Sequence, residues 1–143
     1  MYMSIKEGIL QSLKNTNCRI KPSPIEGVGV FAIKDIPKGT KLFIGSPEKT
    51  FEAISVDELT DYEPEVVEMV KGFFASNEDG KYWIPEGGLN AIDISFFLNH
   101  SENPNVTTTA EGDTFYAARD IVKGEELTSN YAVYDVAYDS GRV

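Results

Sequence analysis

The stretch "VFAIKDIPKGTKL" (30–42) decides the fold, because a second copy of it occurs later in the same chain. The second copy, "FYAARDIVKGEEL" (115–127), aligns without a gap. Both contain an aromatic strand-like segment, then a basic residue, Asp-Ile-x-Lys-Gly and a segment that ends in Leu. Gly39 and Gly124 suit turns that need a positive φ angle. Each copy predicts strand, tight turn and strand, and the pair predicts a domain built from two similar β modules.

Composition places the chain among ordinary globular domains. It has 143 residues, of which 41% are hydrophobic and 25% charged, which suits one domain whose core needs no disulfide or metal. Cys18 is the single cysteine, so no internal disulfide forms and no CxxC pair exists to hold zinc. We therefore expect no metal site. The single cysteine fits an intracellular location in a reducing compartment, although a secreted protein with few cysteines would fit as well.

The charge balance is strongly acidic. Asp and Glu number 23 against 13 Lys and Arg, for a net charge of −10 at pH 7. Direct binding to nucleic acid is disfavoured, because phosphate recognition requires a basic surface. An acidic protein would instead attract a basic partner such as a Lys- or Arg-rich tail. From charge alone, however, the favoured explanation is that the acidic residues only keep the protein soluble.

Two capping boxes mark helices outside the two copies. Ser4 and Glu7 predict a short amphipathic helix near the N-terminus, where no apolar run is long enough for a signal peptide or a membrane span. Ser55 and Glu58 open one or two helices at about 56–71.

The remaining segments favour β structure. A hairpin is expected around Asp79-Gly80, in which Tyr82 and Trp83 pack rather than line a groove. A short helical turn is expected in "AIDISFFLN" (91–99), and two β arms on either side of 111–113. The whole predicts a mostly β (α+β) domain with one helical insertion.

The segment "SFFLNHSENPN" (95–105) places the only histidine among several amide side chains. Ser101, Asn103 and Asn105 are expected to hydrogen-bond their own backbone around Pro104. The segment thus predicts a tight turn whose edge is presented to a ligand.

Three motifs, in this order, resemble those of SET-domain protein methyltransferases. They are "GVGVFA" (27–32), "FFLNHSENPN" (96–105) and "GEELTSNY" (124–131). They are similar to that family's glycine signature, its Asn-His-Ser-x-x-Pro-Asn motif and its Glu-Leu-Thr-x-x-Tyr motif. The resemblance implies a SET-domain β-clip of small sheets with a helical insertion and a C-terminal pseudoknot, in which the histidine segment is threaded beneath the last motif.

The resemblance also implies a division of the chain. Residues 1–17 would form an N-terminal helical flank, 18–135 the SET domain and 136–143 a tail, and the variable insertion at 50–90 would shape substrate choice. Glu102 stands where the family usually has a cysteine, and the tail has none. This departure implies a compact form without zinc-binding flanks.

The activity implied by the resemblance is methyl transfer from S-adenosylmethionine to a lysine side chain. The substrate would be a basic protein such as a histone tail. The cofactor-binding residues implied are Gly27, Val28, Gly29, Phe97, Asn99, His100 and Tyr134. A lone histidine without an Asp or Cys motif partner is more often a hydrogen-bonding residue than a general base, so we assign His100 to binding. Tyr134 would stack on adenine or wall the lysine, or else anchor the C-terminus on the core.

Tyr131 matches the family's catalytic tyrosine, whose hydroxyl orients the amine and stabilises the transferring methyl group. The lysine has to arrive neutral, and burial in an apolar channel beside a cation would lower its pKa without a dedicated base. Phe43, Ser129 and Tyr138 would wall this channel. Phe96 stands where an arginine is common in the family.

A second interpretation is a non-catalytic SET-like module that binds a peptide. Phenylalanine at 43 and 96 favours it, whereas Tyr131 and both glycines of "GVG" favour the enzyme. The physiological substrate, the degree of methylation and the oligomeric state are not determined by the sequence.

Overall fold

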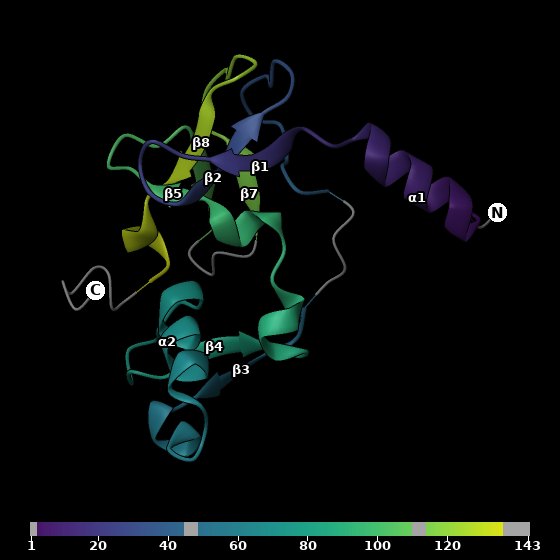
Figure 1. The fold of residues 1–143 in the computed structure, drawn as a ribbon. Coiled ribbons are helices and arrows are strands. Elements are labelled where there is room, and N and C mark those ends of the chain that lie inside the picture. Colours follow the sequence, from purple (N-terminus) through teal and green to yellow (C-terminus); the bar gives the residue numbers. More distant parts are fainter. Residues whose placement is uncertain (1–2, 45–48, 110–113, 136–143) are drawn as a thin grey trace.

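The computed structural model describes residues 3–44, 49–109 and 114–135, and its strands form three small sheets (Figure 1). The largest has the order β1 (Cys18–Pro22), β2 (Val28–Ala32), β8 (Glu126–Ser129) and β5 (Asn99–His100). The other two pair β3 (Phe51–Ile54) with β4 (Tyr82–Pro85), and β6 (Val106–Thr108) with β7 (Phe115–Ala117). The prediction of small sheets with few helices is confirmed.

Helices lie outside the sheets. The α-helices are α1 (Ile5–Lys14) and α2 (Pro64–Phe73), and the 3₁₀ turns are η1 (Val56–Leu59), η2 (Gly88–Ala91), η3 (Ile94–Phe97) and η4 (Tyr131–Val133). Both predicted capping boxes are present, at the start of α1 and of η1. α1 projects away from the rest of the molecule in Figure 1. Within the described residues, no helix is long and apolar enough to cross a membrane.

The two sequence copies pair with each other rather than within themselves. β2, from the first copy, pairs with β8 from the second, where Val30 lies opposite Leu127. In the reverse sense, the Leu42 N–H of the first copy donates to Phe115 O of the second at 2.8 Å. The predicted strand–turn–strand units are therefore present but interlocked, and the second arm of the first copy is reduced to a bridge at Lys41.

At the centre of this arrangement, Ile36 and Ile121 form two reciprocal backbone hydrogen bonds. Ile36 N–H donates to Ile121 O at 2.7 Å, and Ile121 N–H donates to Ile36 O at 2.8 Å. The repeated aspartates cross over as well, because Asp120 accepts from the Lys38 N–H at 2.8 Å. In the same way, the Lys123 N–H of the second copy donates to Asp35 of the first copy at 2.9 Å. Both isoleucines are almost completely buried, so the repeat forms the main core.

The insertion has a small core of its own, joined to the main one by aromatic pairs. Its buried residues are Leu59, Val70 and Phe74. Phe74 packs edge-on against Phe96 of η3, with ring centroids 5.8 Å apart. Its neighbour Phe73 packs edge-on against Phe97 at 5.6 Å. Successive residues of η3 thus contact the end of α2, which fixes the insertion beside the sheets.

The turn that follows the histidine matches the prediction only in part. Ser101 does accept a hydrogen bond from the Asn103 N–H, as expected. The expectation for Asn105 was wrong: its side chain donates to Glu126 O and accepts from the Thr128 N–H, both at 2.8 Å. Asn105 is buried and occupies two backbone groups of β8, so it joins the turn to that strand.

Candidate functional site

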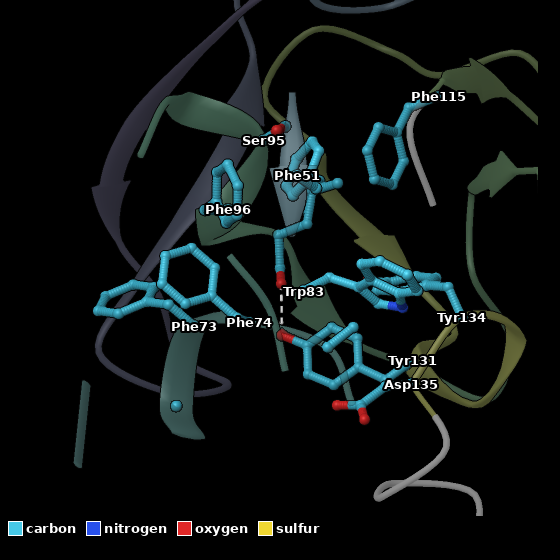
Figure 2. A pocket seen from close by; sticks show the side chains of 13 residues that line it. Phe51, Phe73, Phe74, Trp83, Ser95, Phe96, Phe115, Tyr131, Tyr134 and Asp135 are labelled. Carbon is cyan, nitrogen blue, oxygen red and sulfur yellow. Dashed lines mark hydrogen bonds between the residues drawn. The ribbon is translucent and has the colours of Figure 1, made fainter. Parts of the chain in front are cut away.

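A cavity of about 520 Å³ lies between the insertion and the sheets. Aromatic rings from both parts line it and point toward one another in Figure 2. The lining residues are Phe51, Gly72, Phe73, Phe74, Ala75, Trp83, Ser95, Phe96, Leu98, Phe115, Tyr131, Tyr134 and Asp135. Such a wall accepts an apolar chain and attracts a cation through the ring faces.

Tyr131 joins this cavity to the segment that contains the histidine. Its ring lines the cavity, and its hydroxyl donates to the backbone carbonyl of Leu98 (Figure 2). Its backbone N–H donates to His100 Nδ1 at 3.1 Å, and the two rings lie 5.2 Å apart. The two segments that the sequence analysis singled out therefore meet at this tyrosine. Residues 99–100 (β5) run parallel to β8, which ends just before it.

Tyr134 lies one short turn further along and also lines the cavity. Its hydroxyl is 3.0 Å from Ser129 Oγ, and its ring packs edge-on against Phe115 at 6.3 Å. Burial raises the pKa of the Tyr134 hydroxyl, an effect that the Ser129 hydrogen bond opposes and the nearby Asp135 carboxylate adds to. Tyr134 therefore remains a neutral phenol around pH 7.

Asp135 places a carboxylate in this mostly apolar wall, and the sequence analysis did not identify it. Its Oδ1 accepts from the Ser76 N–H at 3.2 Å and from the Ser76 hydroxyl at 3.1 Å. Ser76 is 2% exposed and belongs to the insertion, so these bonds hold the carboxylate and join the two walls. The cavity therefore presents a fixed carboxylate to a basic side chain that enters it.

Asn99 and the glycine turn form a second group beside β8. The Asn99 amide nitrogen lies 2.8 Å from Glu126 Oε2, 3.1 Å from Ser23 Oγ and 3.2 Å from the carbonyls of Glu26 and Val28. Asn99 is therefore directed at the loop between β1 and β2. The structure brings the first two motifs together through this side chain.

The two glycines of this turn have different reasons to be glycine. Gly27 has a φ of +47°, and a Cβ there would meet no atom within 4 Å. Its backbone is therefore open to an approaching group. A Cβ on Gly29 would instead lie 2.2 Å from Glu126 Oε2, so Gly29 makes room for a side chain of the protein itself.

Several predicted residues do not line the cavity. Phe43 packs edge-on against Phe115 at 5.8 Å, and it is the only non-glycine residue described with a positive φ, +59°. Ser129 is almost fully buried behind Tyr134, and Phe97 packs on the main core. Tyr138 lies outside the described residues.

The insertion contributes residues that the sequence analysis did not assign to a site, namely Phe51 and the 72–75 segment. Trp83 was expected to pack in its hairpin, but it lines the cavity and is 44% exposed. Tyr82 does pack with the insertion core. Neighbouring residues of a strand face opposite sides. Because Tyr82 and Trp83 are neighbours in β4, this alternation was the signal that only one of them packs in the insertion core.

No group of three or more His, Cys, Asp or Glu side chains within the described ranges could hold a metal ion. The chemistry available is instead that of aromatic rings, one fixed carboxylate and the Tyr131 hydroxyl, beside a turn with open backbone.

Comparisons with known proteins identify the family. The SET domain model matches residues 27–132. The chain is 30% identical over 141 residues to the histone-lysine N-methyltransferase trr of Drosophila melanogaster, a match that covers 89% of this chain but only 5% of that protein.

Two solved structures also resemble it. One is a humanized mutant of the Chaetomium thermophilum Polycomb Repressive Complex 2 bound to an inhibitor, with 29% identity and a TM-score of 0.54 over 85% of this chain and 15% of that one. The other is ctPRC2 in an autoinhibited conformation bound to S-adenosylmethionine, with 26% identity and a TM-score of 0.56 over 89% of this chain and 16% of that one. The chain therefore belongs to the SET domain family, as its three motifs indicated.

Proposed function

We propose that the chain transfers the methyl group of S-adenosylmethionine to a lysine side chain of a basic protein, such as a histone tail. One observation carries the proposal: Tyr131 lines the aromatic cavity and also contacts His100 through its ring and its N–H. A lysine in the cavity and a cofactor beside the Asn-His segment would reach the same tyrosine from two sides. Membership of the family of trr, a histone-lysine methyltransferase, supports this class of reaction.

The residues around the glycine turn fit the cofactor in chemical character. The open backbone at Gly27 allows close approach of a ligand, and amide and imidazole groups suit an adenine and an amino acid head. S-adenosylmethionine, when bound, supplies an electrophilic methyl group on a positively charged sulfur. The residues proposed to hold it are Gly27, Val28, Gly29, Phe97, Asn99, His100 and Tyr134.

Tyr131 is the proposed catalytic residue. Its hydroxyl is fixed by the Leu98 carbonyl, so its oxygen lone pairs have a defined direction. An oxygen held in this way would orient the lysine amine and make weak C–H···O contacts with a polarised methyl group. Orientation of two reactants along one axis is the main requirement of an in-line displacement.

The cavity would also adjust the charge of the lysine. Its apolar wall disfavours an ammonium ion and therefore lowers the pKa of a lysine that enters deeply. Asp135 has the opposite effect, since a nearby carboxylate favours the ammonium form. We therefore assign Asp135 to the capture of a basic side chain rather than to its deprotonation. Phe43, Ser129 and Tyr138 remain proposed as parts of the channel around the lysine.

The substrate class is supported by where the charge lies. Residues 50–90 contain ten Asp and Glu against two Lys, a net charge of −8 in a chain whose total is −10. The insertion that forms one wall of the cavity thus carries most of the negative charge. A Lys- or Arg-rich segment would be attracted to this wall by long-range electrostatics, which favours a basic protein over nucleic acid.

Finer features of the fold belong to the same proposal. We propose a β-clip in which the histidine segment is threaded beneath the last motif as a pseudoknot. The parallel pairing of β5 with β8 and the Ser101 N–H···O bond to Ser129, 3.0 Å long, support it. We also propose the division into a flank (1–17), a SET domain (18–135, with its insertion at 50–90) and a tail (136–143), and an intracellular location.

The test is transfer of radiolabelled methyl groups from S-adenosylmethionine to a panel of basic proteins. Label on a lysine of at least one basic protein is the expected result. If the chain labels no protein of the panel and binds no S-adenosylmethionine in isothermal titration calorimetry, the proposed enzymatic activity is refuted. Peptide binding without cofactor binding would instead favour the non-catalytic module, which the phenylalanines at 43 and 96 support.

A further inference from the structure

We infer that Glu126 is a positioning residue that holds the β1–β2 loop (residues 23–27) and Asn99 in the arrangement that receives the cofactor. The inference rests on the proposed function, which assigns this loop and Asn99 to S-adenosylmethionine. Glu126 does not line the cavity. It would act through its neighbours rather than on the substrate.

The carboxylate of Glu126 joins three segments that are distant in sequence. The Ser23 hydroxyl donates to it, at 2.8 and 2.9 Å from its two oxygens. The Asn99 amide donates to Oε2 at 2.8 Å. Hydrogen bonds to an ionised acceptor are about twice as strong as neutral ones. The loop, β5 and β8 are therefore fixed to one another at a single side chain.

Ser23 transmits this contact into the loop. Its hydroxyl accepts from the Ile25 N–H at 3.0 Å and from the Asn99 amide at 3.1 Å. Its backbone N–H donates to Gly27 O at 2.9 Å and closes the loop. A hydroxyl has one proton and two acceptor positions. The proton is directed at the carboxylate, and both acceptor positions are used inside the site.

Gly29 provides the space for this arrangement. A Cβ there would lie 2.2 Å from Oε2, 2.9 Å from Cδ of Glu126 and 3.1 Å from the Asn99 amide nitrogen. Any side chain at position 29 would therefore displace both groups. The second glycine of "GVG" and Glu126 act as one unit, in which the glycine admits the carboxylate and the carboxylate orders the loop.

Affinity for S-adenosylmethionine, measured by isothermal titration calorimetry, tests the inference. Ser23→Ala and Glu126→Gln are each expected to raise the Kd about tenfold, the effect of one charge-assisted hydrogen bond. The double variant is expected to stay near tenfold, because each change already breaks the Ser23–Glu126 hydrogen bond on which the order of the loop depends. Ser23→Thr keeps the hydroxyl and is expected to restore affinity near the wild-type value. Single variants within twofold of wild type, or a double variant near 100-fold, would overturn the inference.

The matched control is Glu125→Gln. It removes the same charge from the adjacent residue, whose carboxylate pairs with Arg119 at 3.2 Å on the surface. Its Kd is expected to be unchanged, and an equal rise would mean that charge alone is responsible.

Hydrogen exchange without cofactor separates this inference from the proposed function. The Ile25 amide is expected to exchange about tenfold faster in Glu126→Gln than in wild type, and at the wild-type rate in Glu125→Gln. If the wild type binds no S-adenosylmethionine, the proposed function fails, and exchange still decides whether Glu126 orders the loop. If the wild type binds the cofactor but exchange is the same in all variants, the inference fails alone.

Discussion

Replacement of Tyr131 by phenylalanine separates the chemistry of the proposed site from its packing. The change removes the hydroxyl that donates to Leu98 O and leaves the ring in place. The ring keeps its contacts with His100 at 5.2 Å and Tyr134 at 6.1 Å. The backbone N–H that donates to His100 is also retained. The shape of the cavity should therefore persist.

The expected magnitudes differ between stability and rate. Loss of one neutral hydrogen bond costs about 0.5–1.5 kcal/mol of unfolding free energy, or a few degrees in Tm. Loss of a positioned polar group at a reacting centre typically lowers kcat about 10²–10³-fold, or roughly 3–4 kcal/mol. The effect on rate should thus exceed what unfolding could explain.

The assay is the initial rate of methyl transfer to the best basic substrate, with thermal unfolding and cofactor titration on the same samples. Tyr62→Phe is the matched control, because Tyr62 is 56% exposed on the insertion and does not line the cavity. We expect the control to keep the wild-type rate. A Tyr131→Phe variant with more than half of the wild-type kcat would refute the catalytic assignment.

Four further outcomes are expected. Asp135→Asn should raise the KM for a basic peptide about tenfold with little change in kcat; a fall in kcat alone would contradict a role in capture. Added salt should raise the same KM, because it screens the charge of residues 50–90, and a salt-independent KM would argue against that wall. Asn105→Leu should lower the unfolding free energy by about 2–4 kcal/mol in denaturant melts, since it leaves two buried backbone groups of β8 unpaired; a loss below 1 kcal/mol would contradict this. Burial raises the pKa of the Cys18 thiol from 9.0 to about 11, so its alkylation near pH 8 should be at least about 100-fold slower than in the unfolded chain, and an equal rate would be inconsistent with burial.

Local features were predictable because short-range physics determines them. The capping boxes at Ser4 and Ser55 needed only a hydroxyl and a glutamate three residues later. The turn at Gly80 has the positive φ that an Asp-Gly pair predicts. The repeat itself was visible because two similar stretches that pair with each other are under the same packing constraints.

Pairing across the repeat was not predictable, because hydrogen bonds between distant strands leave no periodic signal within either strand. The same applies to Asn105. From its residue type we predicted that it bonds the backbone of a local turn, but its hydrogen-bond partners lie in β8. In the sequence, Glu126 could be identified only as a member of the motif at 124–131. Its relation to Gly29 became visible through a distance between two segments 97 positions apart.

The sequence by itself determined the family, the starts of α1 and η1, the two β modules and the residues at which the motifs would meet. Tertiary structure alone decided which rings face the cavity, that Asp135 bonds Ser76 from the insertion, and why the second glycine of "GVG" has no side chain. The physical reason is range: capping and turn formation depend on neighbours in the chain, whereas a cavity wall and a close approach depend on residues that become neighbours only when the chain folds.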